Sequence, residues 1–353
     1  MGFLEGPRRV GKSSLALLLR DELEKREKWR IGYLNLRTMT TANAADRLLT
    51  VVAALAHGRR VTRAADRVRT MIGWFRVRPE VVAGVNSAGS PEVTLRFQQY
   101  REQDQAAIYE DILQLLQQAP EHAGTRVALI LDEFQEVLNL APLLPNLLKA
   151  HYHSGRDLAI VLMGSQQSLM EDIAHSPSAP LYRIGPTIPI GPLPRDVVHN
   201  EIAKRFGWNG IKLRPDVVDV IYDTCYGTAQ DIQTVCAILL DRCRRDSWWT
   251  VTLDGLQDVL LEVVSEVAAR FDEIWTRSSP IQQELLVAIA LHGGQGITRQ
   301  AFLEQLNPHL RRSAPAVLKA AGALQSRDVL EVAEGGYRLK DPFFALYLQE
   351  NAS

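Results

Sequence analysis

The sequence predicts an α/β fold in which a parallel sheet covered by helices comes first and two smaller, mainly helical parts follow. Two apolar runs without polar alternation, Arg126–Leu131 and Leu158–Gly164, are typical of strands buried on both faces. Segments with helical periodicity separate the predicted strands, which is the arrangement of parallel βαβ units. From Arg195 onward the strand signals stop and four helical segments follow, before a last unit of mixed character.

The length of 353 residues suits two or three domains, and the apolar and charged contents of 46% and 23% are typical of globular proteins. We place the domains at 1–192, 193–277 and 278–353. The net charge of -1 excludes a whole-protein attraction to nucleic acid. No apolar run is long enough to span a bilayer and no leader precedes the first strand, so we predict a cytoplasmic protein without membrane contact.

The first domain is expected to follow the βαβ pattern with one insertion. Its predicted strands are Phe3–Leu4, Ile31–Arg37, Arg126–Leu131, Leu158–Gly164 and Ile188–Ile190, and its helices are Ser14–Lys28, Thr40–Leu55, Ile108–Gln118 and Pro142–His151. The first helix has its apolar positions at Leu15, Leu18, Leu19 and Leu23. Only Met1–Glu5 precede the loop after the first strand, so we expect that an upstream segment is missing.

An insertion at about 57–101 interrupts this alternation. It begins with a possible helix, Arg59–Ile72, and continues with two β-like runs, Trp74–Val82 and Val93–Phe97. The residues between these runs are rich in Gly, Asn and Ser, which predicts a hairpin.

The second and third domains differ in their element order. The second is predicted to be a helical lid with the helices Arg195–Phe206, Pro215–Tyr226, Ala229–Arg245 and Asp254–Phe271 only. The third has helices at Ile281–His292, Arg299–Gln305 and Ser313–Gln325, and then β-runs at Val329–Ala333 and Tyr337–Leu339. Three helices followed by a β-wing predict a winged helix-turn-helix.

A phosphate-binding loop follows the first strand. It comprises Gly6, Pro7, Arg8, Arg9, Val10, Gly11, Lys12 and Ser13, with Ser14 directly after it. Glycines at this spacing let backbone N–H groups surround a phosphate at a helix N-terminus. Lys12 supplies a charge for the β- and γ-phosphates, and Ser13 a hydroxyl for Mg²⁺. The alternative is a chance glycine-rich turn, but the spacing and the flanking strand and helix favour a P-loop NTPase that binds ATP.

An acidic pair ends the apolar strand Arg126–Leu131. Asp132 is suited to hold Mg²⁺ beside Ser13, and Glu133 to activate the attacking water as a general base. An acidic pair at a strand end also commonly caps the next helix. Together with the phosphate loop, the pair indicates an enzyme that hydrolyses ATP.

Polar residues also end the strand Leu158–Gly164. In a sheet of this order Ser165 or Gln166 lies between the γ-phosphate and the acidic pair, where it would orient water or sense hydrolysis. The alternative role is an N-cap for the helix Gln167–Ile173, and the sequence does not decide between them.

Four sequence motifs resemble those of the prokaryotic and archaeal AAA+-type ATPases known as archaeal ATPases. They are GPRRVGKSSL, LILDEFQE, VLMGSQQSLM and PLYRIG. The resemblance implies a P-loop ATPase domain, a lid and a C-terminal winged helix. It assigns Lys12 and Ser13 to phosphate and Mg²⁺, Asp132 to Mg²⁺ and Glu133 to the base. It also places Arg183 near a neighbouring subunit's γ-phosphate, with an arginine paired to a surface carboxylate as the alternative.

The winged helix raises the possibility of a DNA partner. Arg311, Arg312, Lys319 and Arg327 lie before, within or just after its predicted recognition helix. The rest of that helix is poor in side chains that read base edges, and acids offset the basic residues of this domain. A winged helix used for protein contacts is therefore the alternative.

A second basic stretch lies in the insertion. Arg60, Arg63 and Arg67 share one face of its predicted helix, and Trp74 and Phe75 follow. Arginines with nearby aromatic residues suit a nucleic-acid strand, although solvated arginine-rich faces are common as well.

The sequence as a whole favours a Mg²⁺-dependent ATPase that acts as a nucleotide switch on DNA, alone or as a homo-oligomer. The alternative is a regulatory or scaffolding module that holds nucleotide with little turnover and signals to a protein partner. Cys225, Cys236 and Cys243 lack metal-site spacing and are predicted to be reduced thiols.

Overall fold

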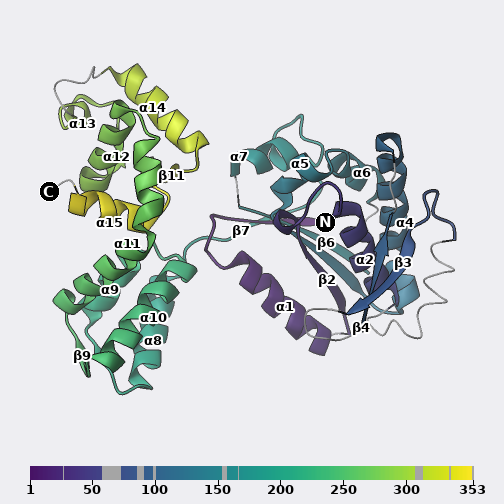
Figure 1. Ribbon diagram of the computed structural model, residues 1–353, viewed down its shortest axis with the longest axis horizontal. Coiled ribbons are helices and arrows are strands. Elements are labelled where there is room, and N and C mark those ends of the chain that lie inside the picture. The colour runs from purple at the N-terminus through teal and green to yellow at the C-terminus, as the bar shows by residue number, and fades with distance from the viewer. Residues whose placement is uncertain are drawn as a thin grey trace. The chain divides into compact units, whose positions relative to one another are not determined.

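The computed structural model describes residues 1–26, 28–57, 73–85, 91–97, 101–152, 157–165, 167–306, 313–333 and 335–351. The chain divides into two compact units, Met1–Gly191 and Pro192–Ser353. Figure 1 labels their helices and strands, and each unit is described by itself. The finer division of the second unit into a lid and a winged helix stays a prediction.

The first unit is built around one parallel sheet. Its elements are β1 (Gly2–Glu5), α1 (Lys12–Arg26), β2 (Arg30–Asn35), α2 (Ala44–His57), β3 (Glu80–Val85), β4 (Pro91–Arg96), α4 (Gln105–Ala123), β5 (Val127–Asp132), α5 (Val137–Leu140), α6 (Leu144–His151), β6 (Leu158–Gly164), α7 (Gln167–Met170) and β7 (Thr187–Pro189). The strand order is β2-β5-β6-β1-β7, and every pair is parallel. The predicted helix-covered parallel sheet is thereby confirmed. Because β6 lies between β1 and β5, the carboxyl ends of these three strands are neighbours.

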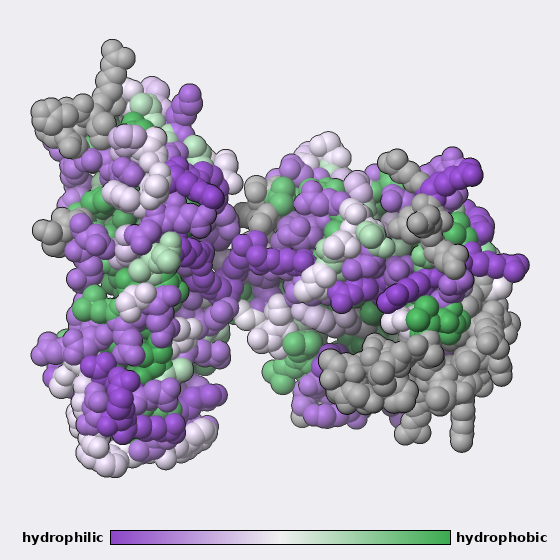
Figure 2. Space-filling model, viewed as in Figure 1, coloured by the Kyte–Doolittle hydropathy of each residue, from purple (hydrophilic) through white to green (hydrophobic). Residues whose placement is uncertain are grey.

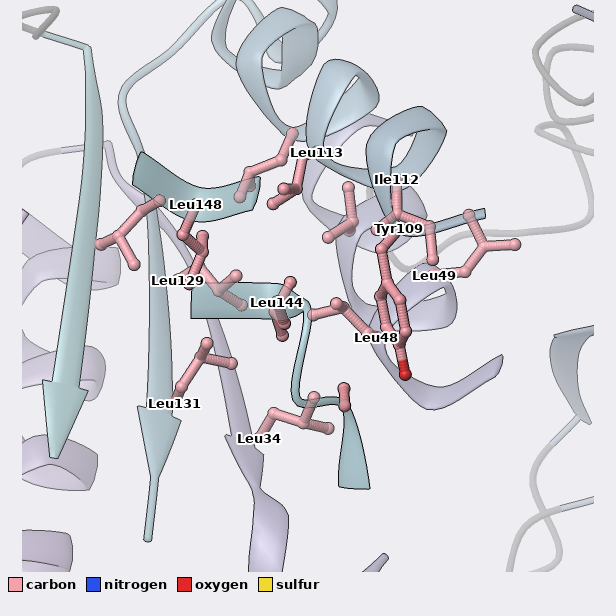
Figure 3. Packing of buried hydrophobic residues seen from close by; sticks show 14 of the residues in the cluster. Leu34, Leu48, Leu49, Tyr109, Ile112, Leu113, Leu129, Leu131, Leu144 and Leu148 are labelled. Atoms are coloured by element: carbon pink, nitrogen blue, oxygen red, sulfur yellow. The ribbon is translucent and has the colours of Figure 1, made fainter. Parts of the chain in front are cut away.

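The two faces of the sheet are covered unequally. The crossover from β1 to β2 runs across the sheet in the opposite direction to the later ones, so right-handed connections place α1 on one face and the other helices on the opposite face. Leu129 and Leu131 of β5 point to the second face, where they pack with leucines of α2 and α6 and with α4 (Figure 3). Ile130, between them, packs with Ala16 of α1 on the first face.

Helix α1 corrects one expectation about its buried side. Leu15, Leu18 and Leu19 are 44%, 62% and 48% exposed, whereas Ala16 is buried and Leu23 only half-buried. The small alanine side chain lets the helix lie close to the sheet. The leucine spacing therefore located the helix correctly but not the side of it that is buried.

The insertion contains an antiparallel hairpin. β3 pairs with β4 from Glu80 opposite Arg96 to Val85 opposite Pro91. Two buried or half-buried acids fasten this segment to the helices, since Asp46 of α2 accepts a hydrogen bond from Phe97 N at 2.9 Å and Asp111 of α4 accepts one from Arg76 N at 2.8 Å. The predicted helix Arg59–Ile72, with Arg60, Arg63 and Arg67, lies outside the described residues.

The second unit is mainly helical and has one continuous apolar core that reaches from α8 to α15. Its elements are α8 (Arg195–Gly207), β8 (Lys212–Leu213), α9 (Pro215–Thr224), α10 (Ala229–Arg245), β9 (Thr250–Val251), α11 (Leu253–Thr276), α12 (Pro280–His292), β10 (Gly294–Gln295), α13 (Gln300–Leu303), α14 (Ala314–Ser326), β11 (Leu330–Ala333), β12 (Gly336–Leu339) and α15 (Pro342–Asn351). The three cysteines of this unit form no disulfide. Across the described part of the chain, no helix is both long and apolar enough to cross a membrane.

Three short or terminal features of this unit differ from the prediction. The segment predicted to contain helices only also has β8 and β9, which pair in parallel where the turns after α8 and α10 meet. The wing has a third strand, β10, so that β12 lies between β10 and β11. Glycine is required at position 294 of β10, because a Cβ there would lie 1.9 Å from the Tyr337 carbonyl oxygen. Helix α15 was not predicted, and it buries Phe343, Phe344 and Leu348.

Candidate functional site

The phosphate loop Gly6–Ser13 joins β1 to α1, which begins at Lys12. Its two glycines are needed for different reasons. A Cβ on Gly6 would lie 2.0 Å from the Ile190 carbonyl oxygen, and Gly11 has a φ of 99°, in the region that favours glycine. The loop thus ends at a helix N-terminus, where backbone N–H groups and the helix dipole favour an anion.

The side chains of the loop are divided between anchoring and exposed positions. Val10 and Lys12 are only 5% and 7% exposed, whereas Pro7 and Ser14 are exposed and Arg8 and Arg9 are half-buried. The Lys12 ammonium lies inside the loop, where it donates to the carbonyl oxygens of Gly6 and Pro7 at 2.7 Å each. A phosphate in the loop would exchange these neutral acceptors for anionic ones, which bind an ammonium more strongly.

A pair of oxygen ligands lies next to the loop. Ser13 Oγ donates to Asp132 Oδ2 at 2.6 Å, and Asp132 is almost fully buried at the end of β5. A hydroxyl beside a carboxylate is a donor set that Mg²⁺ prefers. The two side chains predicted for the metal are therefore in direct contact, and their chemistry fits Mg²⁺.

Tyr33 of β2 also contacts Asp132, through a hydrogen bond from its hydroxyl to Oδ2. Burial, the hydrogen bond and the charge of Asp132 raise the pKa of Tyr33 to about 12, so its hydroxyl remains a donor at every pH at which the protein would be studied. The other oxygen, Oδ1, accepts from Glu133 N at 2.9 Å. These contacts fix the direction in which the Asp132 carboxylate points.

Glu133 follows Asp132 with a left-handed backbone, φ 53° and ψ 47°. Such a conformation is uncommon outside glycine, and it turns the Glu133 side chain away from the line of β5. Its Oε2 accepts from Ser165 Oγ at 2.7 Å and from the side-chain amide of Gln135. Among the described residues, no hydrogen bond is made to Oε1.

The ionisation of Glu133 follows from these contacts. Burial raises the pKa of its carboxyl, but hydrogen bonds from Ser165 and Gln135 and the charges of Arg8 and Lys12 outweigh burial, so that the pKa lies below its ordinary value. Glu133 is therefore ionised at neutral pH, as a general base must be.

Gln135 connects the ends of two strands. It is 1% exposed, its Nε2 lies 3.3 Å from Ser165 Oγ, and its Oε1 accepts from Ser165 N at 3.4 Å. Arg8 Nε approaches the same Ser165 Oγ at 3.5 Å, which extends the network to the phosphate loop. Ser165 thus lies between the loop and the acidic pair, whereas Gln166 is outside the described residues.

Sequence reasoning missed Tyr33 and Gln135. Gln135 is the last residue of the motif DEFQ, two residues beyond Glu133, so the motif could have identified it. Its side chain was nevertheless given no role. Tyr33 carried no comparable signal. Only the sheet order, which puts β2 beside β5, brings its hydroxyl to Asp132.

Arg183 makes no described contact with the hydrogen-bond network of Glu133, Gln135 and Ser165. It is exposed with a φ of 56°, and its guanidinium lies over the ring of Tyr182, 5.1 Å from the centroid. It makes no ion pair with any residue that the structure describes. The predicted alternative, an ion pair between Arg183 and a surface carboxylate, is therefore not seen among the described residues.

The predicted DNA contacts of the winged helix are only partly described. Lys319 is exposed on α14, but Arg327 donates to the carbonyl oxygen of Arg277 at 3.2 Å and so connects α14 to the end of α11. Arg311 and Arg312 lie outside the described residues.

Comparisons with known proteins agree with this architecture. Residues 269–350 match the family model of a probable winged helix domain. No curated protein matches the chain. Among solved structures, the Walker-type ATPase PABY2304 of Pyrococcus abyssi is 17% identical, with a TM-score of 0.58 over 99% of this chain and 90% of that one. The Aeropyrum pernix ORC2 protein is 14% identical, with a TM-score of 0.50 over 100% of this chain and 89% of that one.

At these identities the similarity is one of fold. The chain has the fold of this Walker-type ATPase and of the ORC2 protein, and its residues 269–350 match a winged helix domain. This is the architecture that the resemblance predicted, and the recognition made from the sequence is confirmed at that level.

Proposed function

We propose that the first unit binds ATP with Mg²⁺ and hydrolyses it. The observation that carries this proposal is the contact of Ser13 with Asp132, next to an ionised Glu133 and beside the loop Gly6–Ser13. A protein that only held nucleotide would need the loop and the metal ligands but not a half-buried, ionised carboxylate beyond them. Bound Mg²⁺ would neutralise phosphate charge at Ser13 and Asp132.

The described residues divide the work of the reaction between them. Lys12 and the loop hold the β- and γ-phosphates, and Lys12 stabilises the charge that develops on them. Glu133 takes a proton from the attacking water. Both of its described donors use Oε2, so Oε1 is the oxygen that accepts this proton. Ser165 and Gln135 are positioning residues that hold Glu133, and Tyr33 is one that holds Asp132.

We further propose that the nucleotide state is passed to the second unit, with 193–277 as a lid and 278–353 as a winged helix. Order or rotation set by a γ-phosphate is the usual output of such a switch. Arg183 is assigned to a neighbouring copy's γ-phosphate, since a solvent-exposed guanidinium without an ionic partner among the described residues is available for that contact. DNA is the proposed target of the switch.

Glu133→Gln tests the hydrolytic proposal. The amide keeps the shape of the side chain but cannot take a proton, so we expect kcat to fall by about 100-fold or more while ATP affinity is retained. Phosphate release is measured with Mg²⁺ and with EDTA. Glu136→Gln is the matched control, because Glu136 lies three residues on and its carboxylate makes no described hydrogen bond or ion pair.

One observation favours the alternative of a scaffolding module with a protein partner. The exposed side of α14 includes Leu318, which is 46% exposed, and carries few groups that read bases. That module would retain nucleotide through purification and show the same slow turnover in the parent protein and in Glu133→Gln. A rate that depends on Glu133 excludes it.

A further inference from the structure

Two tryptophans at one end of the second unit are the most exposed large apolar side chains that the structure describes. Trp208 is 71% and Trp249 67% exposed. A large aromatic side chain normally buries most of its surface, because that surface dominates the apolar contribution to folding. Two indoles left in water on the same end of a unit therefore need an explanation, and neither belongs to the nucleotide site.

The fold brings the two turns that carry the indoles together. Trp208 follows the end of α8, and Trp249 follows a turn after α10 in which Ser247 has a φ of 58°. The two turns are joined, since Lys212 N donates to the Trp249 carbonyl oxygen at 2.9 Å and a Cβ on Gly210 would lie 3.6 Å from the Trp249 ring. This end carries the β9 label in Figure 1, and Figure 2 shows it as purple and pale atoms.

Basic residues are concentrated in the two segments that carry the tryptophans. The segments 204–214 and 241–250 contain seven basic residues and two acids. The basic residues are Lys204, Arg205, Lys212, Arg214, Arg242, Arg244 and Arg245, and the acids are Asp241 and Asp246. Three further carboxylates, Glu201, Asp216 and Glu262, pair with arginines of these segments, so seven basic residues face five acids. The tip is therefore locally basic, whereas the whole chain has a net charge of -1.

The cations that lie closest to the indoles differ in their partners. Lys204 Nζ lies 5.2 Å from the centroid of the Trp208 ring, and Arg244 donates to the Asn209 side chain at 2.8 Å, in the turn that carries Trp208. Lys212 is exposed and makes no ion pair with a described residue. Arg244 is also within 4.0 Å of the Asp241 carboxylate, and Arg205, Arg214 and Arg242 are each paired with a carboxylate at 2.7 Å.

We propose that this aromatic-basic tip, formed by Trp208, Trp249, Lys204, Lys212 and Arg244, binds single-stranded DNA. Exposed rings stack on bases, and interspersed cations hold the phosphates between them. In a duplex the base faces are already stacked, so a single strand is the form that uses both indoles. Asn209 Oδ1 accepts from Arg244 and its Nδ2 donates to the Arg205 carbonyl oxygen, so the amide joins Arg244 to the turn that carries Trp208.

The test uses the full chain without ATP, so that its result is independent of the hydrolytic proposal. Binding of a labelled (dT)20 strand is followed by anisotropy, and stacking by the quenching of tryptophan fluorescence. We expect Trp208→Ala together with Trp249→Ala to weaken binding at least about tenfold. Leu291→Ala is the matched control, because it removes an exposed apolar side chain elsewhere in the same unit, and it should leave binding unchanged.

A second pair of variants separates the tip from exposed lysines in general. Lys212→Ala should weaken (dT)20 binding and reduce its salt dependence, whereas Lys149→Ala, at an exposed position of α6, should do neither. Circular dichroism checks that each variant is folded. The proposal is overturned if the parent protein does not bind (dT)20 at low salt, if the double tryptophan variant binds as tightly as the parent, or if a duplex or (rU)20 binds more tightly than (dT)20.

Discussion

The hydrogen-bonded residues at the strand ends of the first unit (the strand-end cluster: Ser13, Tyr33, Asp132, Glu133, Gln135 and Ser165) and the aromatic-basic tip of the second unit are opposite kinds of surface. At the strand ends the polar groups are buried and paired: Asp132 and Gln135 are 2% and 1% exposed, and every described oxygen of Asp132 accepts a hydrogen bond. At the tip the rings of Trp208 and Trp249 are mostly in water, and Lys212 has no ionic partner among the described residues.

The difference is the one expected for the two ligands that we propose. A compact polyphosphate with its metal gains most from groups that are already oriented, because no reorganisation is then needed when it binds or reacts. A long and flexible strand instead gains from an open surface that offers rings and charges without fixing one register. Variants in the two regions should therefore have separable effects.

The largest expected effect is that of Lys12→Ala. The variant removes the one buried cation among the described residues at the loop, and we expect ATP affinity to fall by at least about 100-fold. Nucleotide binding is measured by titration with a fluorescent ATP analogue, with Lys25→Ala on the exposed side of α1 as the control. Binding of (dT)20 should not change. Undiminished ATP affinity would show that the loop is not the nucleotide site.

Tyr33→Phe is expected to have the next largest effect. Without the hydrogen bond from Tyr33, the Asp132 carboxylate can rotate away from the direction in which it would bind Mg²⁺. Loss of such a partner commonly lowers metal affinity by about tenfold or more. The Mg²⁺ dependence of ATP hydrolysis measures it. Because the pKa of Tyr33 is about 12, the loss should be equal at pH 7 and pH 9. Tyr152→Phe is the control, because it removes a half-buried hydroxyl that accepts a hydrogen bond from the Met1 amino group and does not contact Asp132.

An unchanged Mg²⁺ requirement in Tyr33→Phe would mean that Asp132 is held by the backbone of β5 and by Ser13 alone. The hydrogen bond from Tyr33 would then not be needed to orient Asp132 for the metal. The strand-end cluster and the open tip would differ less in how firmly their side chains are oriented before a ligand binds.

The sequence predicted most of the fold because the decisive signals were local. The apolar strands β5 and β6, the glycine spacing of the loop and the acidic pair each depend on a few adjacent residues, and the parallel sheet follows from them. The hairpin was predicted from β-like runs around a turn, but the first run, Trp74–Val82, was placed too early, since β3 is Glu80–Val85.

The parts that were missed depend on contacts between distant segments. Tyr33 reaches Asp132 only through strand order, and β8 pairs with β9 only because two helices end side by side. The buried side of α1 was not predicted because periodicity identifies a stripe of leucines but not what covers it. The exposure of Trp208 and Trp249 likewise could not be read from their identity, since tryptophan is more often buried.

The smallest and most specific effect is expected for Gln135→Met, which keeps the volume of the side chain and removes its hydrogen bonds to Glu133 and Ser165. Those bonds stabilise the ionised form of Glu133, so without them burial raises the pKa of its carboxyl. A hydrogen bond to a charged group is worth about 1.5–3 kcal/mol, which corresponds to about one pKa unit or more. Glu133 must be ionised to act as a base, so the acidic limb of the pH–kcat profile should move to higher pH.

At pH 8 both proteins have an ionised base, and kcat should differ by less than about tenfold with KM for ATP unchanged. Gln114→Met, at an exposed position of α4, controls for the substitution itself. A purely structural role for Gln135 would lower kcat equally at every pH and leave the limb in place. In that case Gln135 would contribute to packing and not to the charge of Glu133. A shift of the acidic limb of the pH–kcat profile is therefore the result that shows an electrostatic role.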